Sequence, residues 1–242
     1  LMRILFVGDI LGKPGRQVTA EWLPQLRKEH DIDLVIVNAE NAAGGNGITE
    51  PVIDMLYNIG VDAITTGNHA WDKREGHGLI EDGRVLRPAN YPADAGGIGA
   101  TVVHTSEAYP VGVLNLQGRT FMQPIDCPFR VARRQIEDLR SEAIVIIVDF
   151  HAEATSEKQA MGWYLDGDVT AVLGTHTHVP TADERVLPEG TAYITDVGMT
   201  GPYESILGME IEGSLNRFLT GRRDRMVPAR NDVRFSAVLI ED

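Results

Sequence analysis

Short runs of consecutive apolar residues alternate, in the first part of the chain, with longer stretches in which apolar residues recur every three or four positions. The runs extend from 3 to 9, from 34 to 41 and from 61 to 64, and helical spacing separates them, at Val18, Trp22, Leu23 and Leu26 and then at Val52, Ile53, Leu56 and Ile59. Continuous apolar runs are typical of strands that are covered on both faces. This strand–helix order predicts parallel strands joined by right-handed crossovers.

The middle of the chain has a weaker pattern. From about 71 to 99, short segments lie between turns rich in glycine and proline. A strand is expected at 111–116, with 100–104 as its hairpin partner. We interpret this region as the point at which one sheet gives way to a second.

Regular patterns return in the second half. Helices are expected at 129–139, 156–165 and 209–219, and strands at 144–151, 169–174, 191–196 and 233–240. No internal repeat and no convincing linker divides the 242 residues. Because α/β folds often reach this length undivided, a single domain spanning residues 1–242 is expected.

Side chains that can bind a metal ion follow five of the predicted strands. They are Asp9, the pair Glu40 and Asn41, the pair Asn68 and His69, His151, and the pair His176 and His178. In open α/β sheets, side chains at the carboxyl ends of the strands meet in one crevice. Carboxylate and amide oxygens combined with imidazole nitrogens suit Mn, Fe or Zn. The set is larger than one ion needs, which favours two ions bridged by a carboxylate, as in two-metal hydrolysis.

The last pair has a spacing of its own. Because His176 and His178 are two positions apart, an extended chain would point both imidazoles to one face. In that conformation the two side chains could serve neighbouring ions.

Composition and charge narrow the choice of partners. A net charge of −13 argues against long contact with a nucleic-acid backbone, which requires clustered Lys and Arg, but it leaves a small phosphate ester open. No apolar run approaches the roughly 20 residues needed to cross a bilayer, and the apolar run at the N-terminus is too short for a signal peptide. A single cysteine, Cys127, excludes an internal disulfide framework. We therefore expect a cytoplasmic protein without a membrane segment.

The ordered residues resemble those of a known family. Asp9, Glu40-Asn41, Gly67-Asn68-His69, His151 and the segment 174–178 follow the order of the calcineurin-like metallophosphoesterase superfamily. The segments 38–47, 149–158 and 198–202 are similar to those of its YmdB-like branch, whose members act on 2′,3′-cyclic nucleotides. The resemblance implies an α/β fold of layered, largely parallel sheets flanked by helices, with a dimetal site at the carboxyl ends of the strands.

Three positions depart from the broader superfamily. Leu11 stands where a histidine usually follows the first aspartate by two residues, Glu40 stands where a bridging aspartate is common, and Ala70 follows Gly-Asn-His in place of an acid. All three departures are shared with the cyclic-nucleotide branch, so they favour that substrate class. They also remove one nitrogen ligand from the first metal.

The resemblance implies roles for individual residues. It assigns Asp9, Glu40 and His178 to a first metal, with Asn41 in or beside its coordination sphere. It assigns Glu40, Asn68, His151 and His176 to a second metal, with Glu40 as the bridge. Iron and manganese are the expected ions, and zinc is an alternative. A metal-bridging hydroxide would attack phosphorus, and His69 would act as general acid.

Two rival functions remain open. One is a phosphomonoesterase or protein phosphatase that uses the same site. The other is a regulatory protein whose metal site binds a nucleotide or an RNA-processing partner. The resemblance also makes a homo-oligomer reasonable.

Several other residues have more than one interpretation. Asp149 and Asp196 are expected either to orient metal ligands or to cap strand ends. Gly44, Gly45 and Gly47 could let the backbone approach a phosphate or could form a plain tight turn, and Lys13 and Arg16 could contact a phosphate or could be ordinary charges at a helix start. Trp71 and Trp163 could stack on a base or be buried in a core or subunit contact, and His77 is a candidate for substrate contact.

Overall fold

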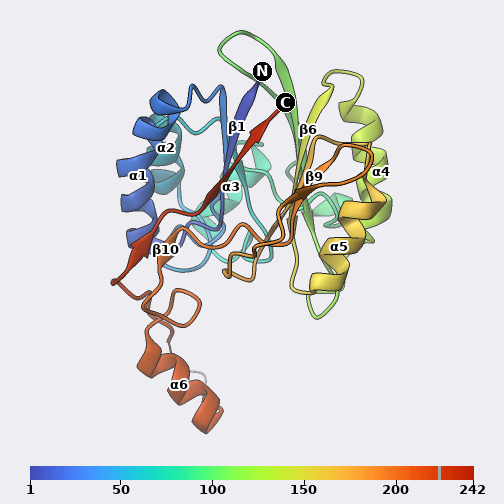
Figure 1. Ribbon diagram of the computed structural model, residues 1–242. Coiled ribbons are helices and arrows are strands. Elements are labelled where there is room, and N and C mark those ends of the chain that lie inside the picture. The colour runs from blue at the N-terminus through green and yellow to red at the C-terminus, as the bar shows by residue number, and fades with distance from the viewer. Residues whose placement is uncertain (223–224) are drawn as a thin grey trace.

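One mixed sheet is built from the two ends of the chain. The computed structural model describes residues 1–222 and 225–242. Strands β1 (Arg3–Val7), β2 (Leu34–Asn38) and β3 (Ala63–Thr65) are parallel, and β12 (Ala237–Glu241) pairs antiparallel with β1, so the order is β12-β1-β2-β3. The chain enters β1 at the top of Figure 1, so the carboxyl ends of the parallel strands face the side from which α6 projects.

A second sheet contains the central part of the chain. Its order is β4-β5-β6-β7-β9-β8. The inner strands β5 (Pro110–Gln117), β6 (Val145–His151), β7 (Ala171–Thr175) and β9 (Ala192–Ile194) are parallel. The edge strands β4 (Ala100–His104) and β8 (Arg185–Val186) are antiparallel to their neighbours. The predicted hairpin and the change to a second sheet are therefore confirmed.

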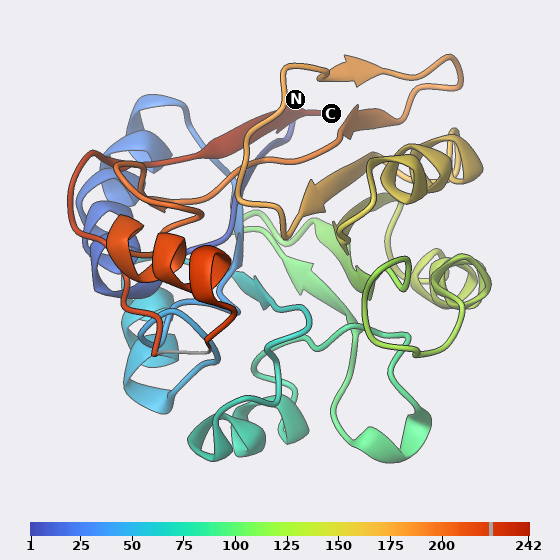
Figure 2. The ribbon, with the colours of Figure 1, turned by 90° about the horizontal axis from the view of Figure 1, so that it is seen from below.

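The two sheets pack face to face, and helices cover their outer faces. Helices α1 (Gly12–Glu29) and α2 (Glu50–Asn58) lie on the first sheet, and α4 (Pro128–Leu139) and α5 (Thr155–Tyr164) lie on the second (Figures 1 and 2). Alternate residues of each strand belong to different cores because side chains alternate across a sheet. Thus Ile4 and Phe6 face the other sheet, whereas Leu5 and Val7 face the helices. The continuous apolar runs follow from this arrangement, since both faces of each sheet are buried.

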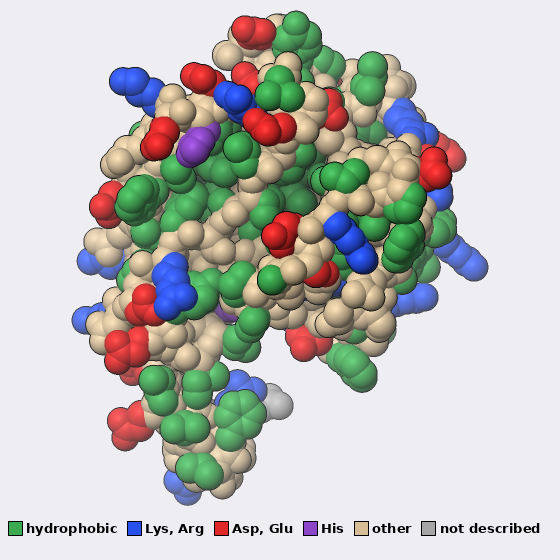
Figure 3. Space-filling model, in the orientation of Figure 1, with side chains coloured by type: hydrophobic (Ala, Val, Ile, Leu, Met, Phe, Trp, Pro, Cys, Tyr) green, Lys and Arg blue, Asp and Glu red, His purple; other side chains and the backbone are tan. Residues whose placement is uncertain are grey.

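The remaining elements are short or peripheral. They are α3 (His77–Glu81), the 3₁₀ turns Arg74–Gly76 and Ala93–Ala95, and the strand pair β10 (Gly201–Pro202) and β11 (Val233–Arg234). Helix α6 (Ile211–Thr220) projects from the body beside the carboxyl ends of the strands and carries exposed apolar side chains (Figures 1 and 3). Among the residues that the structure describes, no helix has the length and apolar character needed to cross a membrane.

The expected fold class is confirmed, and the differences are local. The α/β class, the largely parallel sheets and the flanking helices are as predicted. The final strand predicted at 233–240 is two strands, because the chain leaves β11 at Arg234 and joins the first sheet only at Ala237. Helix α3 and strand β8 were not predicted; at five and two residues, they are too short to produce a recognisable period.

Candidate metal centre

The carboxyl ends of five strands deliver the predicted ligands to one place. Asp9 follows β1, Glu40 follows β2 and Asn68 follows β3, all from the first sheet. His151 ends β6 and His176 follows β7, both from the second sheet. The site therefore lies where the two packed sheets meet, at the ends of their parallel strands.

The imidazole of His151 is the centre of the cluster. Its Nε2 lies 3.1 Å from Glu40 Oε1, 3.0 Å from Asn68 Oδ1 and 3.1 Å from His176 Nδ1. One ligand atom from each of Glu40, His151 and His176 lies within 4.8 Å of the others, so these three residues form a candidate metal-binding group. Glu40 and His151 are buried.

The hydrogen bond at Nδ1 of His151 determines the tautomer of the imidazole, and so which nitrogen can bind a metal. Nδ1 lies 2.9 Å from the Thr175 hydroxyl, and that hydroxyl donates to Asp149 Oδ1 at 2.7 Å. Because the Thr175 hydrogen is used toward Asp149, the Thr175 oxygen accepts the Nδ1–H of His151. When His151 is neutral, its Nε2 lone pair would then be directed toward Glu40 and His176, which is the orientation a metal ligand needs. Asp149 thus orients His151 through Thr175, and Asn38 Nδ2 also donates to this carboxylate, at 2.9 Å.

One buried oxygen of Asp9 accepts no hydrogen bond from any residue that the structure describes. Asp9 Oδ2 accepts the backbone N–H of His176 at 3.0 Å, but among the described residues Oδ1 accepts no hydrogen bond, and His151 Nδ1 lies 3.9 Å from it. The side chain is fully buried, and burial raises the pKa of its carboxyl group. A buried oxygen left without a donor costs free energy. A cation would compensate this cost, so the orphaned oxygen fits a metal site.

Asn41 and His178 lie beside Glu40. Asn41 Nδ2 is 3.1 Å from Glu40 Oε1 and 3.1 Å from His178 Nε2. His178 Nδ1 donates to the Leu207 carbonyl oxygen at 3.0 Å, so Nε2 is the nitrogen that faces the cluster. These contacts place Asn41 and His178 next to the group formed by Glu40, His151 and His176.

Charge in the metal-free site is concentrated on one pair. Burial alone would raise the pKa of Glu40, but the neighbouring His151 more than offsets this effect and the pKa is lowered. Burial alone would lower the pKa of His151, but the charge of Glu40 raises it to about 9. Burial, with His151 nearby, lowers the pKa of His176 to about 3. A proton on His151 therefore balances Glu40 where a cation would otherwise do so.

His69 lies at the edge of the cluster and makes different contacts. Its backbone N–H donates to Glu40 Oε2 at 3.0 Å, while its side-chain Nδ1 is 2.7 Å from Asp72 Oδ2. The imidazole is 37% exposed, and it lines the small cavity that opens over Glu40 and His176. Among the described residues, it is not part of the group whose ligand atoms converge.

The loop after β7 has a strained backbone. His176 and His178 have positive φ values of 98° and 67°, a region that costs about 1–3 kcal/mol for a residue other than glycine. The expectation of an extended segment with both imidazoles on one face is therefore wrong. Because the chain turns at each of these residues, His176 faces His151 while His178 faces Asn41.

Asp196 holds this loop in place. Its Oδ2 accepts the Thr177 hydroxyl at 2.8 Å, the Thr177 N–H at 3.1 Å and the Lys158 ammonium at 2.6 Å. Both Asp196 and Lys158 are buried. Asp196 thus supports the two histidines without touching them.

Glu153 makes a contact to a predicted ligand that sequence reasoning missed, as does Thr175. Glu153 Oε2 lies 3.0 Å from His176 Nε2. Its position two residues after His151 is the only signal that could have found it, and an exposed acid near a helix start is ordinary.

The other open candidates lie outside the cluster. His77 Nε2 contacts the Trp71 carbonyl oxygen at 3.0 Å, and Trp71 packs against the apolar core between the first sheet and helices α1 and α2. Trp163 contacts Arg185 on the surface. Arg16 donates to the Ala42 carbonyl oxygen. Gly44, Gly45 and Gly47 have positive φ values, so a turn explains them.

Known proteins resemble the whole chain. The model of the family "YmdB-like protein" matches residues 5–242. The chain is 50% identical to the 2′,3′-cyclic-nucleotide 2′-phosphodiesterase of Bacillus subtilis (strain 168), over 99% of this chain and 91% of that protein.

Solved structures agree with this assignment. A hypothetical protein from Thermus thermophilus superposes with a TM-score of 0.93 at 46% identity, covering 98% of this chain and 92% of the other. A novel phosphatase from Mycoplasma pneumoniae superposes with a TM-score of 0.91 at 37% identity, covering 98% and 86%. The resemblance that the sequence motifs indicated is confirmed, and the chain belongs to the YmdB-like protein family.

Proposed function

We propose that this protein is a metal-dependent phosphodiesterase that hydrolyses 2′,3′-cyclic nucleotides. The observation that carries the proposal is the convergence of Glu40, His151 and His176 beside the orphaned carboxylate oxygen of Asp9. Such a donor set suits Mn, Fe or Zn ions in a hydrolase. The substrate class is taken from the Bacillus subtilis relative, whose name states that activity.

We assign the ligands to two ions, iron or manganese by preference. Asp9, Glu40 and His178 would hold the first, with Asn41 beside it. Glu40, Asn68, His151 and His176 would hold the second. When bound, the ions would lower the pKa of a water molecule and neutralise charge on the phosphoryl oxygens.

The protein's own residues keep these groups in place. Thr175 holds His151 in the tautomer that presents Nε2, and Asp149 holds Thr175. The N–H of His176 orients Asp9, which leaves the other Asp9 oxygen for a cation. Asp196 and Lys158 support the strained loop that carries His176 and His178.

His69 is the general acid in this proposal. Asp72 accepts from Nδ1, so Nε2 is the nitrogen left to donate. Opening a 2′,3′-cyclic phosphate adds water to phosphorus and breaks one P–O bond to ribose. The leaving ribose oxygen is strongly basic, and a proton from His69 Nε2 would turn it into a hydroxyl group.

A phosphomonoesterase is the second candidate, because one of the similar structures is described as a novel phosphatase. Turnover of bis-p-nitrophenyl phosphate and of p-nitrophenyl phosphate separates the two. Preference for the diester supports the proposal, and a clear preference for the monoester contradicts it.

The direct test uses protein whose metal content is known. Elemental analysis of protein purified without added metal identifies the ion, and a screen of 2′,3′- and 3′,5′-cyclic nucleotides identifies the substrate. We expect Mn²⁺ or Fe²⁺ to support hydrolysis of 2′,3′-cyclic nucleotides and EDTA to abolish it. Metal-loaded protein without this activity would overturn the proposal.

We also propose a cellular compartment and possible partners on the basis of the sequence. One domain spanning residues 1–242 would act in the cytoplasm, where a single cysteine, Cys127, needs no disulfide partner. A regulatory role with an RNA-processing partner, and a homo-oligomer, are compatible with catalysis. Rescue of a deletion phenotype by His69→Ala protein would show that regulation does not need turnover.

A further inference from the structure

A large cavity adjoins the candidate metal centre. It lies between α6 and the loop 44–46, has a volume of about 860 Å³, and reaches His69. It shares Gly45, His69, Leu207 and Met209 with the smaller cavity that opens over Glu40 and His176. Because the two cavities share walls, a substrate whose phosphate sits at the metal centre has its remainder directed toward α6.

The lining of this cavity differs in charge from the rest of the protein. The chain has 35 acidic and 22 basic residues, yet among the described residues that line the cavity none is acidic, while Lys73, Arg217 and Arg225 are basic. Within the described parts of the chain, neither the Lys73 ammonium nor the Arg217 guanidinium has a hydrogen-bond or ion-pair partner. A cleft lined by one sign of charge concentrates ligands of the opposite sign.

The position of Lys73 is built into the loop. Gly47 has a φ of +70°, and a Cβ placed there would lie 2.8 Å from Lys73 Cγ. The absence of a side chain at Gly47 thus allows the aliphatic part of Lys73 to lie directly on the loop backbone. Lys73 lines the same cavity as His69.

One face of α6 completes the cavity. Ser214, Arg217 and Phe218 are spaced at i, i+3 and i+4, and all three line it. Ser214 is buried, and its hydroxyl has no hydrogen-bond partner among the described residues. The Phe218 ring is 80% exposed, so its apolar face is not used in packing within this chain.

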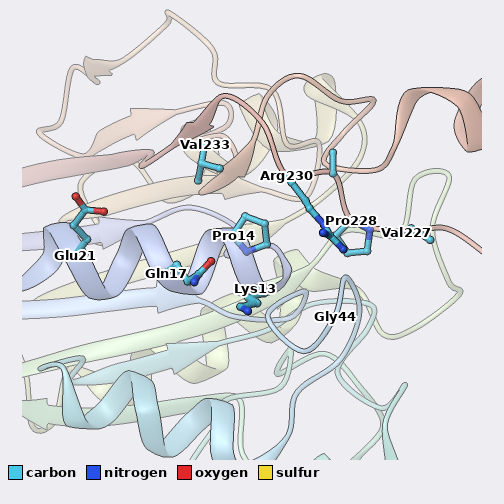
Figure 4. Close-up of a pocket in the computed structure, with 10 residues that line it drawn as sticks. Lys13, Pro14, Gln17, Glu21, Gly44, Val227, Pro228, Arg230 and Val233 are labelled. Carbon is cyan, nitrogen blue, oxygen red and sulfur yellow. The ribbon is translucent and has the colours of Figure 1, made fainter.

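A further cavity continues the same wall. It has a volume of about 680 Å³ and shares Gly44, Val227 and Pro228 with the cavity of about 860 Å³ described above, which we call the α6 cavity. Figure 4 shows Lys13 beside Gly44 and Arg230 beside Pro228, with the acidic Glu21 at the far end. Positive charge therefore continues beyond the part of the cavity that one nucleoside would fill.

We propose that the substrate is the 3′ end of a short RNA strand that terminates in a 2′,3′-cyclic phosphate. This inference rests on the proposed function and extends it. The terminal nucleoside occupies the α6 cavity, where Phe218 stacks on a base, and Lys73 and Arg217 bind the phosphate on its 5′ side. The preceding nucleotide lies toward Lys13 and Arg230. A strand this short is consistent with the net charge, which disfavours only extended contact.

The test compares substrates of increasing length. The compounds are adenosine 2′,3′-cyclic phosphate, its 5′-phosphorylated form, and the di- and trinucleotides of adenosine that end in the cyclic phosphate. We expect kcat/KM to rise about tenfold or more from the mononucleotide to the dinucleotide, since base stacking and phosphate contacts are both gained. Equal kcat/KM for all four compounds, or a gain completed by the 5′-phosphate alone, would overturn the inference.

Matched variants locate the contacts. Lys73→Ala and Arg217→Ala each lower the preference for the dinucleotide over the mononucleotide, whereas Arg74→Ala, which removes the same charge one residue outside the cavity, does not. Phe218→Ala raises KM about tenfold, whereas Leu219→Ala does not, because Leu219 is equally exposed on α6 but does not line the cavity. Equal effects in both members of a pair contradict the inference.

Failure of the two proposals can be told apart. If the mononucleotide is hydrolysed but the dinucleotide is not preferred, the function stands and the RNA inference fails. If no compound is hydrolysed, the fluorescence anisotropy of a 5′-fluorescein-labelled trinucleotide with the cyclic end still measures binding. Binding that Arg217→Ala weakens and Arg74→Ala leaves unchanged supports the inference, and the absence of binding overturns it.

Discussion

The imidazole of His69 lies 2.7 Å from the carboxylate of Asp72, through Nδ1 and Oδ2. Within the part of the chain that the structure describes, the hydrogen bond from His69 to the metal-binding cluster comes from its backbone N–H, which donates to Glu40 Oε2 at 3.0 Å. Its side chain is therefore held toward the cavity by a group outside the cluster. This arrangement separates the role of His69 from that of the ligands, and the first prediction follows from it.

Replacing His69 with alanine should abolish proton donation and leave the metals bound. We expect turnover to fall by roughly 10²–10⁴, the usual range for losing a general acid. Asp72→Asn should reduce turnover less, because the imidazole remains. Activity and elemental analysis are measured on the same preparations. Loss of metal in proportion to activity would make His69 a ligand and contradict the assignment.

Replacing Gly67 with alanine should damage the metal centre although Gly67 has no side chain that could bind a metal. A Cβ at this position would lie 2.1 Å from His151 Cδ2 and 2.3 Å from Nε2, so the imidazole must move. We expect metal affinity to fall by roughly 10–100-fold, as for other changes that disturb the orientation of a ligand.

The matched control for Gly67→Ala is Gly78→Ala, where an added Cβ meets nothing within 4 Å. Metal titration followed by calorimetry compares the two variants with the unchanged protein. Normal affinity in Gly67→Ala would show that His151 is not the central ligand.

Replacing Lys158 with methionine should destabilise the protein and loosen the loop after β7. The Lys158 ammonium lies 2.6 Å from Asp196 Oδ2, and both side chains are buried. Removing one partner of a buried ion pair leaves an uncompensated charge and costs about 3–5 kcal/mol. Urea unfolding measures the loss in free energy of unfolding.

The double variant Lys158→Met/Asp196→Asn provides the check on this explanation. It removes both charges, so it should be less destabilised than the sum of the two single variants. Additive losses would mean that the two side chains act independently.

The stability of metal-free protein should depend on pH through His151. Its pKa, which burial lowers but the charge of Glu40 raises to about 9, lies above the ordinary value of 6.5. The imidazolium therefore contributes stability that is complete below pH 6.5 and is lost as pH rises through 9. We expect the Tm of EDTA-treated protein to fall across this window.

A bound cation replaces that proton, so the metal affinity should rise with pH by up to about tenfold per unit. Differential scanning fluorimetry with and without Mn²⁺ measures both effects. Burial raises the pKa of Asp149 to about 6, so this carboxyl group titrates below pH 6.5 and does not contribute to the change in Tm between pH 6.5 and 9. An unchanged Tm of the metal-free protein between pH 6.5 and 9 would contradict the proposed Glu40–His151 pair.

Most strands and the position of the site could be predicted from the sequence because the patterns that indicate them lie within short segments of the chain. The continuous apolar runs before Asp9, Glu40 and His151 are what strands buried on both faces require, and the structure has β1, β2 and β6 there. The carboxyl ends of parallel strands share one edge, so the ligand residues could be placed together before any distance was known. The YmdB-like resemblance added the family and the substrate class.

Other features depend on contacts between residues far apart in the chain. The link from Asp149 through Thr175 to His151, the pairing of Lys158 with Asp196 and the contact of Glu153 with His176 join side chains from different elements. His176 and His178 have positive φ values, which cost free energy in residues other than glycine. The hydrogen bond from Thr177 to Asp196, which forms only in the folded protein, stabilises the loop in this conformation. The periodicity of apolar residues in the sequence indicates which residues are buried. Which buried side chains contact one another is determined only by the packing of the helices and sheets in the folded protein.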